Sequence, residues 1–179
     1  MYGVIALFDE QTEQMIRNIW DELTERSISF YADEVVDRKP HITLASYNHF
    51  IKSDFIKQMD DFYNNAPELD ISFSSIGSFL RSGALYFTPI VTRELLDFHS
   101  NHHKRFVLFN DDPESLYLPD RWIPHCTIAN RLSPEKLAEG FHYCSRRNDA
   151  IYGKITEVAI IEFMDKSNVP VIYSKKLER

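Results

Sequence analysis

The stretch RKPHITLASY, residues 38–47, returns in altered form as RWIPHCTIAN, residues 121–130. Each copy contains the pattern Pro-His-x-Thr-hydrophobic-Ala, and the position between the histidine and the threonine varies. A single His-x-Thr in a strand is usually a half-buried histidine beside a β-branched neighbour, but two copies in matching frames favour two halves of one catalytic site. The repeated residues are His41 and Thr43 in the first copy, and His125 and Thr127 in the second.

The residues around the two motifs repeat as well. The separation between His41 and His125 nearly equals the separation between Gly3 and Gly83, the glycines that precede the first strand of each half. Two copies are too few for a solenoid, which buries a continuous core only with three or more repeats. We therefore predict a pseudo-symmetric protein whose two lobes join near residues 79–83.

The predicted domain is single and spans residues 1–179, because a chain of this length has room for one substantial core. Its two duplicated lobes are expected at roughly residues 1–80 and 81–179. The predicted class is α/β (α+β), with antiparallel-rich sheets, helices on their outer faces and a central cleft between the sheets. The motif residues are expected to line that cleft.

Hydrophobic periodicity predicts the order of strands and helices. Apolar or alternating runs predict strands at 3–8, 41–46, 69–79, 84–90, 125–130, 154–164 and 169–177, and alternation allows another at 27–33. Apolar residues at helical spacing predict helices around 15–23, 51–62 and 91–109, and Ser133 before Pro134 marks the start of a fourth. The last two strands are expected to form a hairpin.

Composition limits the classes of function. The chain is 44% hydrophobic and 13% aromatic, which is typical of a packed globular protein. Its formal net charge of −7 argues against a protein that coats duplex DNA, and leaves room for a small nucleotide or a short RNA end in a local electropositive pocket. Two cysteines, no secretory signal at the start and no apolar run of membrane-spanning length predict a cytoplasmic protein without disulfides or a membrane segment. We expect a monomer.

Strand geometry places the polar residues of each motif side by side. Residues two apart in a strand point to the same face, so His41 lies beside Thr43, and His125 beside Thr127. Across a shared cleft, one imidazole can take a proton from an attacking oxygen while the other protonates the departing oxygen of a phosphodiester. The threonine hydroxyls can donate hydrogen bonds to the non-bridging oxygens. This chemistry needs no metal.

With this pair of motifs, the sequence resembles the two-histidine (2H) phosphoesterase superfamily, and in particular its 2′,5′ RNA ligase-like and cyclic phosphodiesterase members. The resemblance covers essentially the whole chain, because the strand order, the two halves and both motifs fit. It implies metal-independent hydrolysis, without a cofactor, of 2′,3′-cyclic phosphates or 2′,5′ linkages in RNA ends or small nucleotides. It also implies catalysis by His41 and His125 and phosphate binding by Thr43 and Thr127. Which histidine is the base stays open, because the pseudo-symmetry makes the two interchangeable.

Further side chains near the motifs are candidates for substrate binding. The cations Arg38, Lys39 and Arg121 could supply local positive potential, and the aromatic residues Tyr47, Tyr86 and Phe87 could stack on a base. Ordinary core packing is at least as good an explanation for each aromatic residue.

Two rival interpretations follow from other features. His99 and His103 have the i, i+4 spacing of zinc ligands on a helix, which would suit a metal-dependent hydrolase if a third ligand came from elsewhere. A protein of the same fold could also bind a nucleotide or RNA end without catalysis, although binding alone does not require two proton-transfer groups. Cys126 is expected to face away from His125 and to pack in the core.

Overall fold

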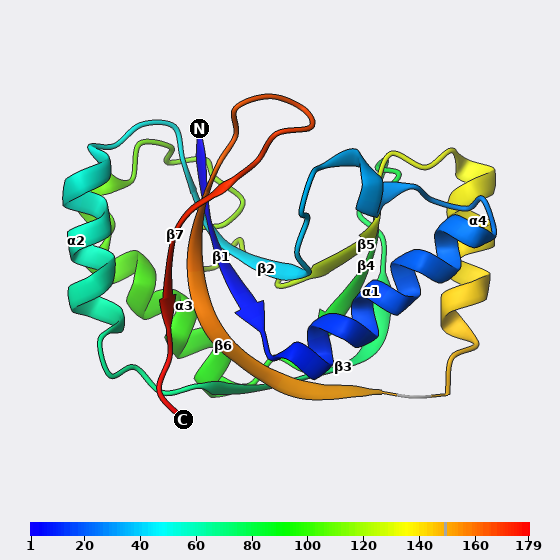
Figure 1. The fold of residues 1–179 in the computed structure, drawn as a ribbon, viewed down its shortest axis with the longest axis horizontal. Helices are drawn as coiled ribbons and strands as arrows, with labels where there is room; N and C mark the ends of the chain where they lie inside the picture. The colour runs from blue at the N-terminus through cyan, green and yellow to red at the C-terminus, as the bar shows by residue number, and fades with distance from the viewer. Residues whose placement is uncertain (149) are drawn as a thin grey trace.

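The computed structural model describes residues 1–148 and 150–179, and within them seven strands form one sheet with four α-helices packed against it (Figure 1). The strands are β1 (Tyr2–Phe8), β2 (His41–Tyr47), β3 (Leu69–Gly77), β4 (Leu85–Pro89), β5 (Cys126–Ala129), β6 (Ile151–Glu162) and β7 (Val171–Lys176). The helices are α1 (Glu10–Glu25), α2 (Lys52–Tyr63), α3 (Arg93–Arg105) and α4 (Pro134–Ser145), with short 3-10 helices η1 (Tyr31–Glu34) and η2 (Val107–Phe109). The predicted mixed class and antiparallel pairing are confirmed, but the strands form one continuous sheet where a separate sheet was expected in each lobe.

The sheet is curved so that its two ends meet. The strand order is β2-β1-β6-β3-β4-β5, with β7 also paired to β6, and every pair is antiparallel. The long strand β6 joins the two halves, since it pairs with β3 near its start and with β1 further along. Strands β2 and β5 stand at opposite ends of this order, yet they contact each other in the middle of the molecule (Figure 1). These are the two strands that carry the repeated motifs.

The helices lie at the two ends of the molecule in pairs that mix the halves of the sequence. At one end α2 packs against β7 and α3 against β2, and at the other α1 packs against β5 and β6 and α4 against β3 and β4 (Figure 1). Helix α1 therefore lies with α4, which comes from the other half of the chain. The predicted division into 1–80 and 81–179 does not separate the two ends in space, and the duplication itself stays a prediction.

Alternation along β1 places residues on both faces of the sheet. Val4, Ala6 and Phe8 join the main hydrophobic core under the helices. Ile5 and Leu7 point to the opposite face, where they form a small cluster with Ala159 and Ile161 from β6. The face opposite the helices is thus apolar at its centre.

Most predicted elements are confirmed, and one strand is wrong. Residues 27–33 form no strand, because α1 ends in a turn at Ser27, whose φ is 53°, and η1 follows. Ile28 and Tyr31 of this segment are buried against the core without strand pairing, at 4% and 7% exposed, whereas Phe30 is 55% exposed. The predicted fourth helix begins as expected, with the Ser133 hydroxyl accepting a hydrogen bond from the Lys136 backbone N–H.

The helix predicted over 91–109 is shorter in the structure. Thr92 caps its start, and it ends at Arg105, so that Phe106 lies at the C-cap and Phe109 in η2. The predicted hairpin forms between β6 and β7, and the Asp165 carboxylate closes its turn by accepting from the backbone N–H groups of Ser167 and Asn168.

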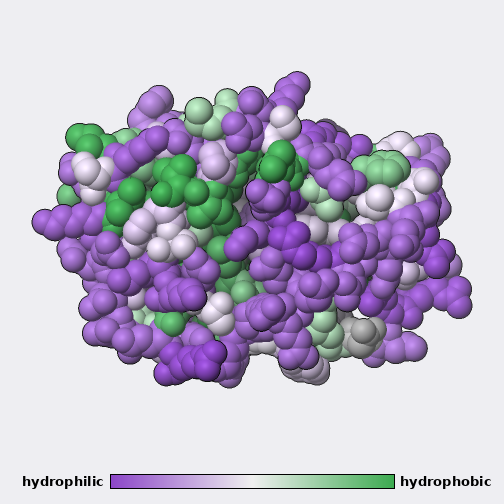
Figure 2. All heavy atoms as spheres, in the orientation of Figure 1, coloured by the Kyte–Doolittle hydropathy of each residue, from purple (hydrophilic) through white to green (hydrophobic). Residues whose placement is uncertain are grey.

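The surface seen in Figure 2 is mostly hydrophilic, and hydrophobic side chains gather on the half that carries α2 and α3. The segment after α3 exposes apolar side chains, among them Val107, Leu108 and Leu116. None of the helices in the described part of the chain has the length and apolar character that crossing a membrane requires.

Gly83 marks a close approach of two backbones, and alanine there is expected to destabilise the fold. An added Cβ would lie 2.3 Å from both the N and the O of Leu132, whose N–H donates to the Gly83 carbonyl at 3.0 Å. We expect Gly83→Ala to lower the free energy of unfolding by about 1–3 kcal/mol or more, measured by urea denaturation. Gly3→Ala is the matched control, because the nearest contacts of its Cβ would be side-chain atoms, of Ile161 at 3.1 Å and of Phe163 at 3.6 Å, and no backbone atom. Equal losses in the two variants would contradict the explanation.

Candidate active site

The two motifs come together on the sheet face opposite the helices. On β2, Ile42 is fully buried in the main core while His41 and Thr43 face the other way, as the alternation predicts. Cys126 is likewise fully buried in the core, and the prediction that it packs there is confirmed. His41, Thr43, His125 and Thr127 all line one cavity of about 570 Å³.

Loops form the walls of this cavity. One wall is the segment between α1 and β2, including η1, and another is the hairpin between β6 and β7. The two walls are tied by a hydrogen bond from the Val36 backbone N–H to the Ser167 carbonyl, at 3.2 Å. The loop between β3 and β4 contributes Phe79, and Ile5 of β1 lies on the apolar floor.

Both motif histidines are held in the same way. The Nδ1 of His41 is 2.7 Å from the Lys39 carbonyl, and the Nδ1 of His125 is 2.7 Å from the Ile123 carbonyl. Because a carbonyl can only accept, each Nδ1 carries the proton, and each Nε2 has a lone pair to offer. The two half-sites therefore present equivalent tautomers, each ready to accept a proton.

The environment lowers the pKa of both imidazoles. Burial lowers the pKa of His41 to about 4, and the positive charges of Arg38 and of a protonated His125 act in the same direction. Burial also lowers the pKa of His125, opposed by its bond to the Ile123 carbonyl. Both rings are thus neutral at pH 7 in the free protein, and a bound phosphate would favour protonation of one of them.

Four residues that the sequence did not identify contact Thr43 and Thr127. Each of them comes from the half of the chain that does not contain the threonine it contacts. The Tyr31 hydroxyl lies within hydrogen-bonding reach of Thr127, and the Tyr117 hydroxyl within reach of Thr43. The indole nitrogens repeat this crossing: Trp20 Nε1 donates to the Thr127 carbonyl at 3.3 Å, and Trp122 Nε1 to the Thr43 carbonyl at 2.9 Å. No sequence pattern marks these four residues, because each contact joins segments far apart in the chain.

The predicted substrate-binding cations divide into two groups. Arg38 and Lys39 line the cavity. Arg121 does not line it and forms an ion pair with Glu114 at 2.8 Å, so its assignment to the site is wrong. On the far side of the cavity, Arg131 follows β5 and pairs with Glu34 of η1.

The predicted aromatic residues do not offer a stacking face in the cavity. Tyr47 is 3% exposed, and its hydroxyl bonds His102 Nε2 at 3.0 Å, so the prediction of base stacking is wrong. Phe87 is buried in the main core. Tyr86 is also buried, and its ring packs 5.2 Å from that of His125 and 4.5 Å from that of Phe79, which places it behind the imidazole of His125. Phe79 is the aromatic side chain of this cluster that lines the cavity.

His99 and His103 serve the structure of β2. The Nε2 of His99 lies 2.8 Å from the Tyr117 carbonyl and that of His103 lies 3.0 Å from the Leu44 carbonyl, so both nitrogens carry protons and donate. Neither Nε2 can then bind a metal, and only the Nδ1 of each ring keeps a lone pair. Within residues 1–148 and 150–179, no group of three or more His, Cys, Asp or Glu could hold a metal ion. The lack of a third ligand among these residues argues against the zinc interpretation.

Comparison with known proteins agrees with this geometry. The profile of the 2′-5′ RNA ligase superfamily matches residues 12–166. The chain belongs to this superfamily. The resemblance predicted from the two motifs is therefore confirmed. A search of curated proteins with this sequence finds no match.

Solved structures share the fold of this 2′-5′ RNA ligase superfamily member. Escherichia coli LigT in its apo form superimposes with a TM-score of 0.66 at 11% identity, covering 99% of this chain and 97% of LigT. The protein TT0787 of Thermus thermophilus gives a TM-score of 0.63 at 14% identity, covering 98% of this chain and 97% of that protein. LigT complexed with 3′-AMP gives 0.65 at 12% identity, covering 99% and 97%. At these identities the similarity establishes the fold alone.

Proposed function

We propose that the protein is a metal-independent phosphodiesterase that acts on a 2′,3′-cyclic phosphate or a 2′,5′ linkage, in an RNA end or a small nucleotide. The observation that carries this proposal is the shared cavity, in which both His-x-Thr pairs meet and each imidazole has Nε2 available. Two proton-transfer groups and two hydroxyl donors around one space suit the displacement at a phosphorus atom.

The proposed reaction uses the two imidazoles in opposite roles. The neutral imidazole takes a proton from water as its oxygen bonds to phosphorus, and the protonated imidazole gives a proton to the ribose oxygen as the P–O bond breaks. The hydroxyls of Thr43 and Thr127 donate to the non-bridging oxygens, where negative charge increases. We assign the base to His41 and the acid to His125, because Arg38 beside His41 disfavours protonation of that ring.

The size of the cavity and the ligands crystallised with LigT both support a ligand of nucleotide size. The cavity of about 570 Å³ has the size of small-molecule sites in proteins. LigT, which shares the fold, has been crystallised with 3′-AMP, with ATP and with NADP⁺. These complexes are of LigT, and they support a nucleotide or nucleotide-like substrate for this chain.

A substrate panel in EDTA tests the proposal. We expect purified protein to turn over at least one of these: 2′,3′-cyclic nucleotides, 2′,5′-oligoadenylates, ADP-ribose cyclic phosphate or RNA with a cyclic end. The pH profile of kcat/KM should be bell-shaped, with the rising limb below pH 6.5, since burial lowers the pKa of the proposed base to about 4. Tight binding without turnover would favour a nucleotide-binding module instead. Activity lost in EDTA and restored by zinc would contradict the proposal.

A further inference from the structure

Arg38 is a partly buried cation with one donor that lacks an acceptor. Its side chain is 14% exposed, and its Nε is buried without a hydrogen-bond partner among the described residues. Its Nη2 lies 3.7 Å from the Glu34 carboxylate, which is longer than a hydrogen bond. Burying a charged donor without an acceptor costs more free energy than leaving it in water. The guanidinium also reaches the Tyr31 hydroxyl, so Nε is the donor of Arg38 left without a partner among the described residues.

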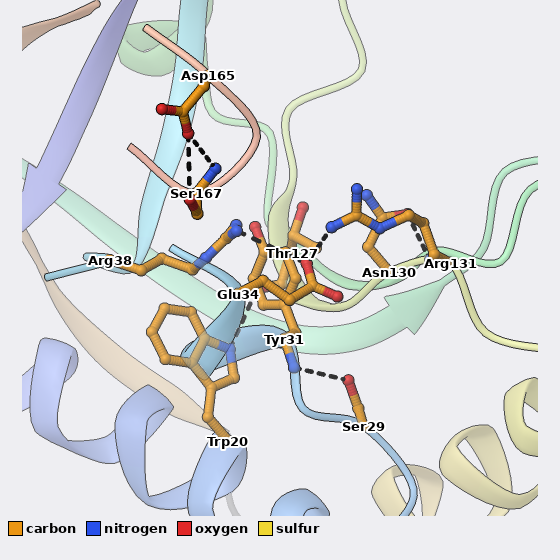
Figure 3. Close-up of polar contacts among 10 residues, drawn as sticks. All are labelled: Trp20, Ser29, Tyr31, Glu34, Arg38, Thr127, Asn130, Arg131, Asp165 and Ser167. Atoms are coloured by element: carbon orange, nitrogen blue, oxygen red, sulfur yellow. Dashed lines mark hydrogen bonds and ion pairs between the residues drawn. The ribbon is translucent and has the colours of Figure 1, made fainter. Parts of the chain in front are cut away.

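The position of Arg38 identifies where an acceptor would lie. The guanidinium stacks on the ring of Tyr31, with its Cζ 3.8 Å from the ring centroid. In Figure 3 it reaches from the loop before β2 toward Tyr31 and Thr127, on the far half of the site. The same cation acts on His41, whose pKa it lowers. Arg38 thus lies between His41, the proposed base of one half-site, and Thr127 of the other half-site. This position is beside the space where the phosphate would be bound.

The two halves of the site differ at this position. Arg38 lies three residues before His41, and the residue three before His125 is Trp122. Trp122 is neutral, stacks on His99 at 3.8 Å and donates to the Thr43 carbonyl. The positive charge at this position therefore belongs to one half-site alone, which breaks the pseudo-symmetry of the cavity.

We propose that Arg38 binds the non-bridging oxygens of the reacting phosphate and offsets the negative charge that develops there. This inference rests on the proposed function and names a further catalytic residue for it. Arginine presents its donors in a planar fork that matches phosphate, and its charge does not depend on pH in the working range. Arg38 lines the cavity, so its guanidinium is placed to donate to a phosphate bound there.

Glu34 limits the strength of this anion site. Its carboxylate forms ion pairs with Arg38 and with Arg131, which reaches it from the other side in Figure 3. A bound phosphate and this carboxylate would both be negative and would repel each other across Arg38. Removing the charge of Glu34 is therefore expected to strengthen phosphate binding, whereas removing the charge of Arg38 weakens it.

Binding of 3′-AMP by calorimetry, together with kinetics on the substrate that the panel identifies, tests the inference. We expect Arg38→Gln to weaken 3′-AMP binding about 10- to 100-fold, the range of a charged hydrogen bond. Its kcat/KM should fall by about 10²-fold, because the transition state carries more charge than the bound ground state. Arg93→Gln is the matched control, since Arg93 is an exposed arginine on α3 whose partner is Asp97. Melting temperatures show whether each variant is folded.

Two further variants separate a direct role from a structural one. Arg38→Ala should regain activity when guanidinium is added at non-denaturing concentration, which a merely structural loss would not allow. Glu34→Gln should bind 3′-AMP more tightly than the native protein. If Arg38→Gln binds and reacts like Arg93→Gln, the inference is overturned while the proposed function stands. If the native protein hydrolyses no member of the panel, the proposed function fails, and the 3′-AMP measurements still decide whether Arg38 is an anion ligand.

Discussion

Replacing His41 or His125 with alanine is expected to lower kcat/KM by about 10²–10⁴, the usual contribution of a general acid or base. Each ring is the proton-transfer group of one half-site, and its Nδ1 is already bonded to a backbone carbonyl. The loss should be similar for both residues, because the reaction needs one proton taken and one given. Steady-state kinetics on the preferred substrate measure it.

Matched variants show whether the loss is specific. Thr43→Val and Thr127→Val should cost less than the histidine variants, since each removes one hydrogen-bond donor and no proton transfer. His49→Ala should leave kcat/KM unchanged, because its side chain is 94% exposed and lies outside the lining of the cavity. Full activity in either alanine variant of a motif histidine would exclude the two-histidine mechanism.

A second large effect is expected on stability in acid. Burial lowers the pKa of His99 to about 4, and it holds the pKa of His102 well below the usual 6.5. His102 is fully buried, and both of its ring nitrogens bond tyrosine hydroxyls, those of Tyr47 and Tyr63. The folded protein therefore keeps both rings neutral at a pH where the unfolded chain has protonated them.

The direction of the pH effect follows from this difference in bound protons. Below pH 6.5 the unfolded state binds more protons than the folded state, so the free energy of unfolding falls as the pH falls. At about 1.4 kcal/mol for each unit of pKa, His99 alone accounts for a loss of about 3 kcal/mol between pH 6.5 and its folded pKa of about 4. Above pH 6.5 this loss is absent.

Urea denaturation at a series of pH values from 7 to below 5 measures this loss. His99→Gln is expected to be less stable than the native protein at pH 7, because it disturbs the bonds to the carbonyls of Leu44 and Tyr117, and to show a shallower pH dependence. His49→Gln is the control and should keep the native slope, since His49 is exposed. A slope for His99→Gln equal to that of the native protein would contradict the assignment.

Local patterns predicted the parts of the site that local geometry controls. The strand period places His41 with Thr43 on one face and Ile42 on the other, so the cavity-facing residues of β2 can be identified from the sequence. The repeated motif then identifies the second strand. The hairpin and the start of α4 depend on turn and cap residues close together in the chain, and these predictions are also confirmed.

Contacts between distant segments could not be predicted in this way. Tyr47 follows the motif directly, as a base-stacking residue could, but its burial depends on α3, which supplies His102. Trp20 and Trp122 support the threonine carbonyls only because the curved sheet brings opposite halves together. The grouping of the helices could not be predicted either, because each end of the molecule takes one helix from each half of the chain (Figure 1).

The meeting of β2 and β5 has a consequence for association between molecules. A strand at the end of a sheet order usually offers unpaired backbone groups that can recruit a strand from another copy, the first step of aggregation or domain swapping. Here these two strands contact each other, and side chains already donate hydrogen bonds to three of their backbone carbonyls: those of Thr43, Leu44 and Thr127. The curvature that assembles the cavity also makes β2 and β5 inaccessible to a foreign strand, and among the described strands it leaves β7, which pairs with β6 alone, with a free edge.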